Sequence, residues 1–326
     1  MKTIAVICGG YSKEEIVSLK SGEQIAQAID PKRFNVYKVL INKTGWSVLT
    51  EKAQLTIDKN DFSFMLDGNK IVFDAVFMAI HGTPGEDGKL QSYFEILNIP
   101  ITTCNSFVSA LTFNKFATKN YLKEYGILTA KAVLLRKNQP FVESDIIKQL
   151  GLPIFVKPNN GGSSFGVTKV KEVGQLVEAI EKALVEDIEV ILEEFIEGQE
   201  FTCGAFVSAT ENLVLPITEI VSKTEFFDYK AKYEGLSDEI TPARLSKDQT
   251  AECQSLTREI YTILNCNGVV RIDFLLRNNK FYFMEVNTVP GMSKESIVPQ
   301  QVRAFGLTVT QFYTKLIEDA LQRSHR

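Results

Sequence analysis

The chain has 326 residues, a formal net charge of −4 and a hydrophobic content of 44%. This length exceeds the ~250–300 residues at which a single core stops growing, so we expect two or three domains. Lys and Arg are spread along the chain without a basic stripe, which disfavours nucleic acid or an anionic membrane as the main partner. No apolar run approaches the ~18–20 residues of a membrane span and no signal-peptide pattern follows Met1, so we predict a cytoplasmic protein.

Cysteine and histidine patterns exclude several kinds of site. The five cysteines are widely spaced and lack a CxxC pair, so neither a disulfide framework nor a zinc site is predicted. Of the two histidines, His325 lies in the basic C-terminal tail, which leaves only His81 for a Ser/His/Asp or Cys/His system. No GxSxG motif accompanies it, so hydrolase-type nucleophilic catalysis is not expected.

The first hundred residues alternate predicted strands with predicted helices. The hydrophobic pattern predicts strands at residues 3–8, 36–41 and 73–80 and helices at residues 11–29 and 89–97. Such alternation is typical of an open, mainly parallel sheet whose loops at the strand ends form a binding crevice. The turn Gly9-Gly10-Tyr11-Ser12 lacks the G-x-G-x-x-G fingerprint of dinucleotide sites, so nicotinamide chemistry is not predicted.

Two turns in this region carry polar groups. Ser12 is expected to cap the first helix with Glu15 in a capping box, and Glu14 lies where the helix dipole favours a carboxylate. The Gly-rich loop HGTPGEDG follows a predicted strand and places His81 and Glu86 at the crevice. Simple helix capping and an ordinary strand-to-helix turn stay open as alternatives.

A second unit begins near Cys104. Its pattern predicts a helix over SFVSALTFNKFATKNYLKEYGI, strands at 130–136 and 153–157, and a helix at 143–150. The loop KPNNGGSSFG, which starts at Lys157, is small and rich in donors, so its N–H groups can approach phosphates while Lys157 supplies a positive charge. It is not a Walker A loop, and a plain hairpin turn is the alternative. Taken alone, Lys115 is a surface lysine.

The segments from residue 172 to residue 264 contain two further candidate features. A helix at 172–185 precedes a strand at 189–196, after which backbone groups and Glu200 could face an adenosine. Residues 222–242 lack periodicity and are long for a structureless connection, which is typical of a lid; Lys232 and Tyr233 are its most useful side chains. A helix at 247–264 follows.

The segment from Val269 to Ser296 predicts a hairpin, because apolar and polar residues alternate on both sides of Asn278 and Asn279. A loop at Asn278–Lys280 would pair Asp273 with Glu285 and Arg271 with Asn287 on one face. The other face would hold the apolar pairs Ile272/Val286, Phe274/Met284 and Leu276/Tyr282. Asp, Glu and Asn oxygens suit Mg²⁺ with phosphates completing the shell. A solvated face is the alternative, and a bulge would break the predicted parity. Helices at 296–305 and 309–322 end the chain.

Five motifs now coincide: GGYSKEEIVSL, HGTPGEDG, VKPNNGGSSFGV, DYKAKY, and RIDF with MEVNTVPGMSKES. In this order and over essentially the whole length, the sequence resembles the D-alanine:D-alanine ligases of the ATP-grasp superfamily. The resemblance implies an α/β fold, α+β in the C-terminal half, with three domains and ATP held between two antiparallel sheets. The three implied domains are an N-terminal Rossmann-like domain with a parallel sheet (1–103), a central ATP-grasp domain (104–193) and a C-terminal ATP-grasp domain (194–326) with the lid. The implied reaction joins two D-alanines through a D-alanyl phosphate, with ATP split, for peptidoglycan precursors.

The resemblance also implies roles for single residues. Phosphates of ATP would be held by Lys115, Lys157 and Ser164, and adenosine by Glu193, Glu194, Ile196, Glu200 and Leu275. Two Mg²⁺ ions, or Mn²⁺ in their place, would be held by Asp273, Glu285 and Asn287. Glu14, Ser163 and Tyr233 would orient the first D-alanine and the lid, and Arg271 with the Gly291 N–H would form an oxyanion hole. His81 would hold the first substrate's carboxylate, and Lys232 and Ser296 the second's. Relatives often carry Lys at the position of Glu194, so only its backbone role carries over.

Three alternatives stay open. A D-alanine:D-lactate or D-alanine:D-serine ligase has the same fold, although Tyr233 in DYKAKY resembles the dipeptide-forming enzymes. An ATP-grasp ligase that acts on other carboxylates is a second alternative. A non-catalytic nucleotide-binding module is a third, and the intact Arg271, Asp273, Glu285 and Asn287 disfavour it. The partners implied are D-alanine and ATP, and homodimers are usual in the family.

Overall fold

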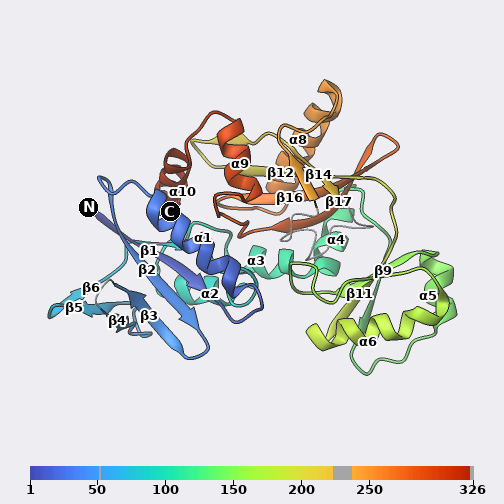
Figure 1. The fold of residues 1–326 in the computed structure, drawn as a ribbon, viewed down its shortest axis with the longest axis horizontal. Coiled ribbons are helices and arrows are strands. Elements are labelled where there is room, and N and C mark those ends of the chain that lie inside the picture. The colour runs from blue at the N-terminus through green and yellow to red at the C-terminus, as the bar shows by residue number, and fades with distance from the viewer. Residues whose placement is uncertain (51–52, 223–236, 324–326) are drawn as a thin grey trace.

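The computed structural model describes residues 1–50, 53–222 and 237–323. Lys232 and Tyr233, both predicted to act from the lid, lie outside the described residues. Figure 1 shows an N-terminal sheet at one end of the molecule, a central sheet at the other and a C-terminal sheet between them. Among the described residues, no helix has the length and apolar character needed to cross a membrane.

The N-terminal sheet has the strand order β4-β3-β2-β1-β7. Its strands are β1 (Lys2–Gly9), β2 (Phe34–Asn42), β3 (Gly45–Leu49), β4 (Gln54–Thr56) and β7 (Ala75–Met78), and a separate hairpin is formed by β5 (Phe64–Leu66) and β6 (Asn69–Ile71). β1 runs parallel to β2 and β7, whereas β2, β3 and β4 pair antiparallel. The sheet is therefore parallel at its centre with an antiparallel edge. A tight turn produces that edge, since the Asn42 carboxamide oxygen accepts bonds from the N–H groups of Thr44 and Gly45.

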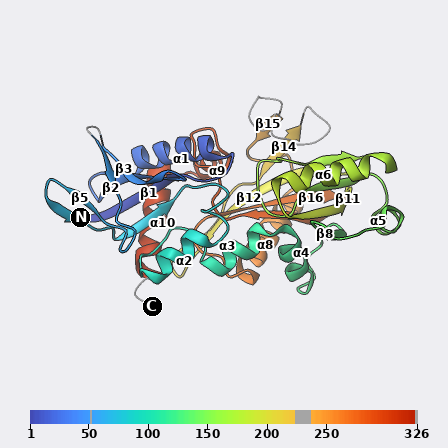
Figure 2. The ribbon, with the colours of Figure 1, turned by 90° about the horizontal axis from the view of Figure 1, so that it is seen from below.

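Alternate residues of β1 face two different cores. Ile4 and Val6 pack with α1 (Glu15–Ala28) and α10 (Val309–Arg323), whereas Ala5 and Ile7 pack with α2 (Lys89–Ile96). Figure 2 shows α1 and α2 on opposite sides of β1. Because both faces are covered, the strand reads as one continuous apolar run. The C-terminal helix α10 thus completes the first sheet.

The central sheet, in the order β10-β9-β11-β8, is antiparallel throughout. Its elements are β8 (Ala132–Arg136), β9 (Ile154–Pro158), β10 (Thr168–Val170) and β11 (Glu189–Glu194), with the helices α5 (Glu143–Leu150) and α6 (Leu176–Glu186) and the 3₁₀ turn η1 (Val173–Gln175). Ile154 and Val156 of β9 face the two α-helices, while Phe155 and Lys157 face the opposite side. The strand predicted at 189–196 ends at Glu194.

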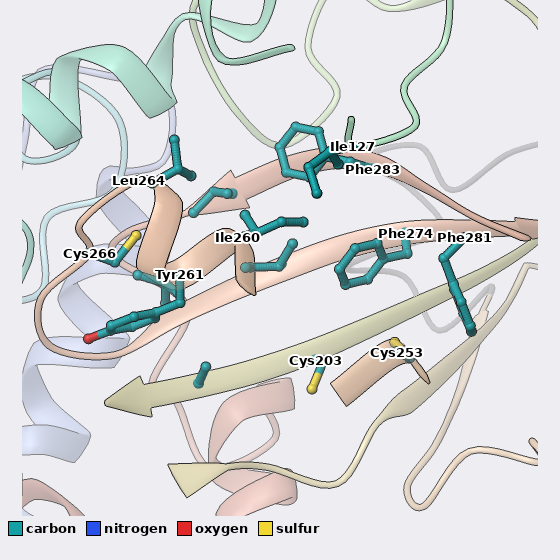
Figure 3. Packing of buried hydrophobic residues seen from close by; sticks show 14 of the residues in the cluster. Ile127, Cys203, Cys253, Ile260, Tyr261, Leu264, Cys266, Phe274, Phe281 and Phe283 are labelled. Atoms are coloured by element: carbon teal, nitrogen blue, oxygen red, sulfur yellow. The ribbon is translucent and has the colours of Figure 1, made fainter. Parts of the chain in front are cut away.

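The C-terminal sheet has the order β15-β14-β12-β16-β17, with β13 also on β12. Its strands are β12 (Gln199–Val207), β13 (Asn212–Val214), β14 (Thr218–Ser222), β15 (Ser237–Ile240), β16 (Val270–Arg277) and β17 (Lys280–Asn287). Helices α3 (Ser106–Phe113), α4 (Lys115–Lys123) and α8 (Lys247–Ile263) contribute to the core on one face, and α9 (Ile297–Ala304) follows the hairpin. Figure 3 shows Phe274, Phe281 and Phe283 of the hairpin with Cys253 and Ile260 of α8.

The single helix predicted after Cys104 is in fact two helices that meet at Asn114. This residue has φ −89° and ψ 101°, outside the helical region, and its side chain accepts a bond from the N–H of Ala117. Asn at an N-cap satisfies a helix donor that would otherwise lack a partner. Lys115 therefore lies at the first position of a new helix rather than within a longer one.

The hairpin β16-β17 confirms part of the predicted register and corrects the rest. Asp273 pairs with Glu285 and Arg271 with Asn287, as predicted. A bulge between Asp273 and Phe274 shifts the remaining pairs, so Phe274 faces Phe283 and Leu276 faces Phe281. The predicted pairs Phe274/Met284 and Leu276/Tyr282 are wrong. The loop is also shorter than predicted: Asn278 and Asn279 alone form it, both with positive φ (50° and 59°), as tight hairpin turns require.

The five cysteines are free and buried. The capping box predicted at Ser12 is absent. Helix α1 begins at Glu15 with Glu14 at the N-cap and no side-chain cap. Ser12 instead donates to the carbonyl of His81 (3.1 Å), because the turn is bound to the neighbouring loop.

Candidate active site

A cleft of about 1430 Å³ lies between the central sheet and the C-terminal sheet, and turns of the N-terminal sheet line part of its wall. Many of the residues singled out from the sequence line it: Glu14, Lys115, Lys157, Ser163, Ser164, Glu193, Glu194, Ile196, Glu200, Arg271, Asp273, Leu275 and Glu285. His81, Asn287, Gly291 and Ser296 are not among the lining residues. Each of the two antiparallel sheets thus packs one face against an apolar core and turns its other face to the cleft.

The hairpin wall of the cleft holds a fixed carboxylate. Arg271 binds Asp273 with two bonds, from Nε (2.9 Å) and Nη2 (2.8 Å), and Asn287 Nδ2 adds a third at 3.1 Å. Thr202 on the neighbouring strand β12 donates to the same carboxylate. Asp273 is 6% exposed, so these donors replace water and hold its two oxygens in place.

The Met284 side chain lies on the opposite face of the hairpin from the one predicted. Leu275 lies on the cleft side with Asp273 and Glu285, as predicted, and Phe274 is turned into the core. Met284, predicted to turn away, lines the cleft, because the bulge leaves it without a cross-strand partner.

The donor set at the hairpin fits a hard divalent cation. Asp273, Glu285 and Asn287 offer carboxylate and amide oxygens, which Mg²⁺ prefers. Among the residues described, no group of three or more His, Cys, Asp or Glu side chains could hold a metal ion. The three predicted ligands are two carboxylates and one amide, so oxygens of a phosphate ligand would have to complete the shell.

The opposite wall carries a carboxylate between two lysines. Glu193 lies on β11 with its Oε2 2.6 Å from Lys157 Nζ and its Oε1 2.5 Å from Lys119 Nζ. Burial raises the pKa of Glu193, but attraction from Lys119 and Lys157 outweighs it and lowers the pKa to about 2. Sequence reasoning missed Lys119. Its spacing of four residues from Lys115 on a helix was the available signal.

The Gly-rich loop is anchored at its base and covers one end of the cleft. Asp187 accepts two bonds from Asn160, from the backbone N–H (2.7 Å) and the side chain (2.8 Å). Ser163 and Ser164 have positive φ (52° and 57°), so the loop turns sharply. The Lys115 Nζ donates to the carbonyl of Gly161 and lies 3.4 Å from a Glu285 oxygen. The loop is therefore bound to the same lysine that faces the hairpin.

A turn of the N-terminal sheet meets this loop. Ser163 Oγ donates to Oε1 of the Glu14 carboxylate, and a Cβ added at Gly162 would lie 3.0 Å from the same Oε1. Gly82 has φ +66°, and a Cβ there would lie 2.9 Å from the other Glu14 oxygen. Glycine at both positions lets two loops close around one carboxylate. The predicted pairing of Glu14 with Ser163 is thus present as a contact.

Beyond Glu194 the chain leaves the sheet ladder at the rim of the cleft. Glu194 Oε1 accepts from the N–H of Lys131 (2.8 Å), and its own N–H donates to the carbonyl of Lys131 (3.0 Å). The segment 195–198 follows without strand pairing and lines the cleft. The Phe195 N–H donates to the carbonyl of Pro153 (3.2 Å), so the backbone that can face a flat ligand begins at Ile196, whereas the Glu194 side chain faces Lys131.

A smaller polar cluster lies behind the cleft. His81 is 6% exposed and its Nε2 lies 3.2 Å from Ser21 Oγ, which accepts from the N–H of Met292. Burial lowers the pKa of His81. A Cβ on Gly291 would lie 2.9 Å from Ser296 Oγ, so these two residues are neighbours. The structure therefore gathers His81, Gly291 and Ser296 near one another but outside the lining of the main cleft.

Glu86 joins the HGTPGEDG loop to the turn after the hairpin. Its carboxylate accepts from the N–H of Gly82 (2.7 Å) and the N–H of Val289 (3.4 Å). Burial raises the pKa of Glu86 to about 8, and the negative charge of Glu14 adds to the shift. No role was predicted for this side chain beyond its place at the crevice.

Comparison with known proteins gives concordant results. The family model described as D-ala D-ala ligase N-terminus matches residues 3–104, and that described as D-ala D-ala ligase C-terminus matches residues 121–318. A D-alanine–D-alanine ligase of Phocaeicola vulgatus is 48% identical over 320 residues, which cover 98% of this chain and 99% of the relative.

Solved structures are similar over the whole chain as well. The D-alanine–D-alanine ligase of Bacillus anthracis complexed with ATP has a TM-score of 0.81 at 28% identity, covering 100% of this chain and 99% of the other. The VanG D-Ala:D-Ser ligase of Enterococcus faecalis has a TM-score of 0.85 at 33% identity, covering 97% and 98%.

Proposed function

The chain belongs to the D-alanine–D-alanine ligase family, and from this premise we propose how its residues join two D-alanines with ATP as the energy source. It is an ATP-dependent ligase with the ATP-grasp fold, and its product is a building block of peptidoglycan. The observation that carries the residue assignments is the cleft itself. One wall presents Asp273, Glu285 and Arg271, and the other presents Lys157 and Glu193.

The first step activates a carboxylate. A carboxylate is a poor electrophile, so an oxygen of the first D-alanine attacks the γ-phosphorus of ATP, giving D-alanyl phosphate and ADP. The protein contributes positioning and positive charge. Lys115 and Lys157 supply the charge from the two sides of the cleft, and Ser164 with the loop N–H groups covers the phosphates.

Asp273, Glu285 and Asn287 would hold Mg²⁺, for which Mn²⁺ is a substitute. When bound, the ion would neutralise charge on the phosphates. The protein's own part is to keep the Asp273 oxygens in place, which the bonds from Thr202 and Arg271 do.

The second step forms the amide bond. The amine of the second D-alanine attacks the acyl carbon, and the resulting tetrahedral oxyanion releases phosphate. We assign the Arg271 guanidinium and the Gly291 N–H as donors to this oxyanion, and the bonds from Arg271 Nε and Nη2 to Asp273 hold the guanidinium in place. Removing one such donor typically costs about 10²–10³ in rate.

Substrate binding is assigned to the N-terminal turns and the end of the hairpin. We assign Glu14, Ser163 and Tyr233 to orienting the first D-alanine and His81 to its carboxylate. Lys232 and Ser296 are assigned to the carboxylate of the second. The loop that Glu14 binds would shield the acyl phosphate, because water would otherwise hydrolyse it.

Adenosine would lie at the rim formed by Glu193, Glu194, Ile196, Glu200 and Leu275. The cleft between the two antiparallel sheets supports this placement, and the segment 195–198 supplies backbone groups. We propose domain boundaries at 103/104 and 193/194, a homodimer, and a cytoplasmic location where ATP is available.

Phosphate release with ATP and Mg²⁺ tests this function. We expect release with D-alanine and none above background with L-alanine. Mass spectrometry should find D-alanyl-D-alanine as the main product when D-lactate or D-serine is also present. A dominant depsipeptide or mixed dipeptide would reassign the second substrate, and no D-alanine-dependent release would refute the proposal.

A further inference from the structure

Lys119 is a buried cation that the reaction described above does not use. It lies one turn after Lys115 on α4 and is 2% exposed. A lysine is almost never fully buried unless it is paired. The burial of Lys119 therefore requires a partner with the opposite charge.

The partner of Lys119 comes from the other wall of the cleft. Helix α4 packs on β17 of the C-terminal sheet, whereas Glu193 belongs to β11 of the central sheet. The Lys119 Nζ lies 2.5 Å from Glu193 Oε1, and the two side chains are 3% and 7% exposed. This ion pair joins the two layers between which the nucleotide would lie.

Both oxygens of the Glu193 carboxylate are held by a lysine. Oε1 is buried and lies against Lys119 Nζ, and Oε2 lies 2.6 Å from Lys157 Nζ. The two lysines therefore fix one orientation of Glu193, in which it lines the cleft.

The charges of the cluster depend on Lys119. Two ammonium groups share one carboxylate, so the set Lys119, Lys157 and Glu193 carries a net positive charge. Attraction from Glu193 outweighs the cost of burial and raises the pKa of Lys157, whereas burial lowers the pKa of Lys119. Without Lys119, Glu193 would pair with Lys157 alone and cancel the charge that faces the phosphates.

We propose that Lys119 is a positioning residue of the nucleotide site, which holds Glu193 toward the nucleotide base and leaves Lys157 a net positive charge for the phosphates. The inference rests on the proposed function in one respect, that ATP binds in this cleft. Lys119 itself touches neither the base nor the phosphates. It acts through Glu193 and Lys157.

The test compares Lys119→Met with Lys123→Met. Lys123 is one turn further along the same helix and exposed, so the control loses the same charge from the same element. ADP binding in MgCl₂ is measured by calorimetry, and turnover is measured with ATP and D-alanine. We expect Lys119→Met to raise the Kd for ADP and the KM for ATP about tenfold or more. The KM for D-alanine and kcat at saturating ATP should stay close to those of the parent, and Lys123→Met should match the parent throughout.

A double variant separates positioning from folding. If Lys119 acts through Glu193, Lys119→Met/Glu193→Gln should bind ADP about as tightly as Glu193→Gln alone. Lys119→Met leaves Glu193 paired with Lys157, so no buried charge is left without a partner. The double variant leaves Lys157 without Glu193, but its side chain is 15% exposed, so we expect both variants to fold, as checked by circular dichroism. Three results would each overturn the proposal. The first is a double variant whose loss of ADP affinity equals the product of the two single losses. The second is a Kd for Lys119→Met equal to that of Lys123→Met, and the third is that neither Lys119 variant folds. ADP binding without any D-alanine-dependent turnover would refute the proposed function but leave this inference standing.

Discussion

Asp273 shows how a single side chain is prepared for chemistry by its neighbours. Donors from β12, β16 and β17 meet on its carboxylate, so its orientation is fixed before a ligand arrives. Its cross-strand partner Glu285 is more exposed, at 27% of its side chain, and faces Lys115. The two carboxylates therefore differ in burial, and that of Asp273 is fixed by side chains from three strands.

Glu285→Gln should lower turnover by orders of magnitude without unfolding the protein. The change keeps the shape of the side chain but removes a negative charge from the site proposed for Mg²⁺, so we expect kcat to fall about 10²-fold or more. Because the side chain is partly exposed, the free energy of unfolding should change by less than about 1 kcal/mol. Steady-state kinetics and urea denaturation measure the two effects, with Glu252→Gln on the exposed face of α8 as the control. A collapse of folding would make Glu285 structural instead.

Glu86 should give the protein a pH-dependent stability. In the folded state it keeps its proton up to a pKa of about 8, whereas the unfolded chain releases it near the usual value of 4.5. Between these values the folded state holds more protons, so stability falls as pH rises, by at most about 1.4 kcal/mol per pH unit. Glu86→Gln removes this loss.

Urea denaturation of Glu86→Gln and the parent from pH 5 to pH 9 measures the effect. The stability of the variant relative to the parent should rise from pH 5 to about pH 8 and then level off. Glu124→Gln, an exposed carboxylate on the surface, should show no such trend. A flat difference across the range would mean that Glu86 ionises normally.

Single residues were predictable where a local pattern contained them. Asp273 and Glu285 follow from the alternation of the hairpin, and Lys157 from the composition of its loop. Lys119 could not be found in this way, because its partner Glu193 lies 74 positions further along the chain and on another sheet. Only the folded chain shows that a helix lysine is buried against a distant carboxylate.

At the scale of elements, the hairpin and the Gly-rich loop differ in how they are fixed. The hairpin is secured by a ladder and by apolar packing of Phe274, Phe281 and Phe283. The loop contributes no residue to the four apolar clusters of the described chain, and it is held by Asn160 at its base and Ser163 at its tip. Elements of the second kind open at lower free energy, which suits a loop that must admit ATP.

Asp187→Ala should loosen the loop. It removes the acceptor of two bonds from Asn160, a loss of about 1–2 kcal/mol in holding the closed loop, so kcat/KM for ATP should fall about five- to thirtyfold. More acyl phosphate should be lost to water, which raises the ratio of phosphate released to dipeptide formed. Both quantities come from one assay with chromatography of the dipeptide. Glu181→Ala, exposed on the preceding helix, should leave the ratio at one, and an unchanged ratio in Asp187→Ala would contradict the anchoring role.

The elements that were predicted have the right type, but some strands were missed and several ends differ. The short strands β3 to β6 and β10 were not predicted, and β15 lies within the segment 222–242 that was predicted to lack regular structure. The break at Asn114 was missed because apolar spacing continues across it, and only the capping bond to Ala117 marks the new helix. The bulge at Asp273 was missed for a similar reason. A strand with an extra residue keeps its alternation on either side, so the shift becomes visible only when the partner strand is in place.

At the scale of the molecule, the C-terminal part of the chain packs against the N-terminal part. Helix α10 packs on the sheet that the first residues build, and Glu86 reaches the turn after the last hairpin. Sequence periodicity assigns helices and strands but not which sheet a helix covers. The overall arrangement was available beforehand only through the resemblance of five ordered motifs, whereas the cleft with its two charged walls required the structure.

The central claim is that the cleft joins two D-alanines through an acyl phosphate. D-alanine labelled with ¹⁸O in its carboxylate tests it most directly, because the attacking oxygen must leave with the phosphate. We predict one ¹⁸O atom in inorganic phosphate for each D-alanyl-D-alanine formed, measured by mass spectrometry of both products. Dipeptide formed with unlabelled phosphate would contradict the acyl phosphate, and labelled D-alanine that yields no dipeptide would contradict the ligation itself.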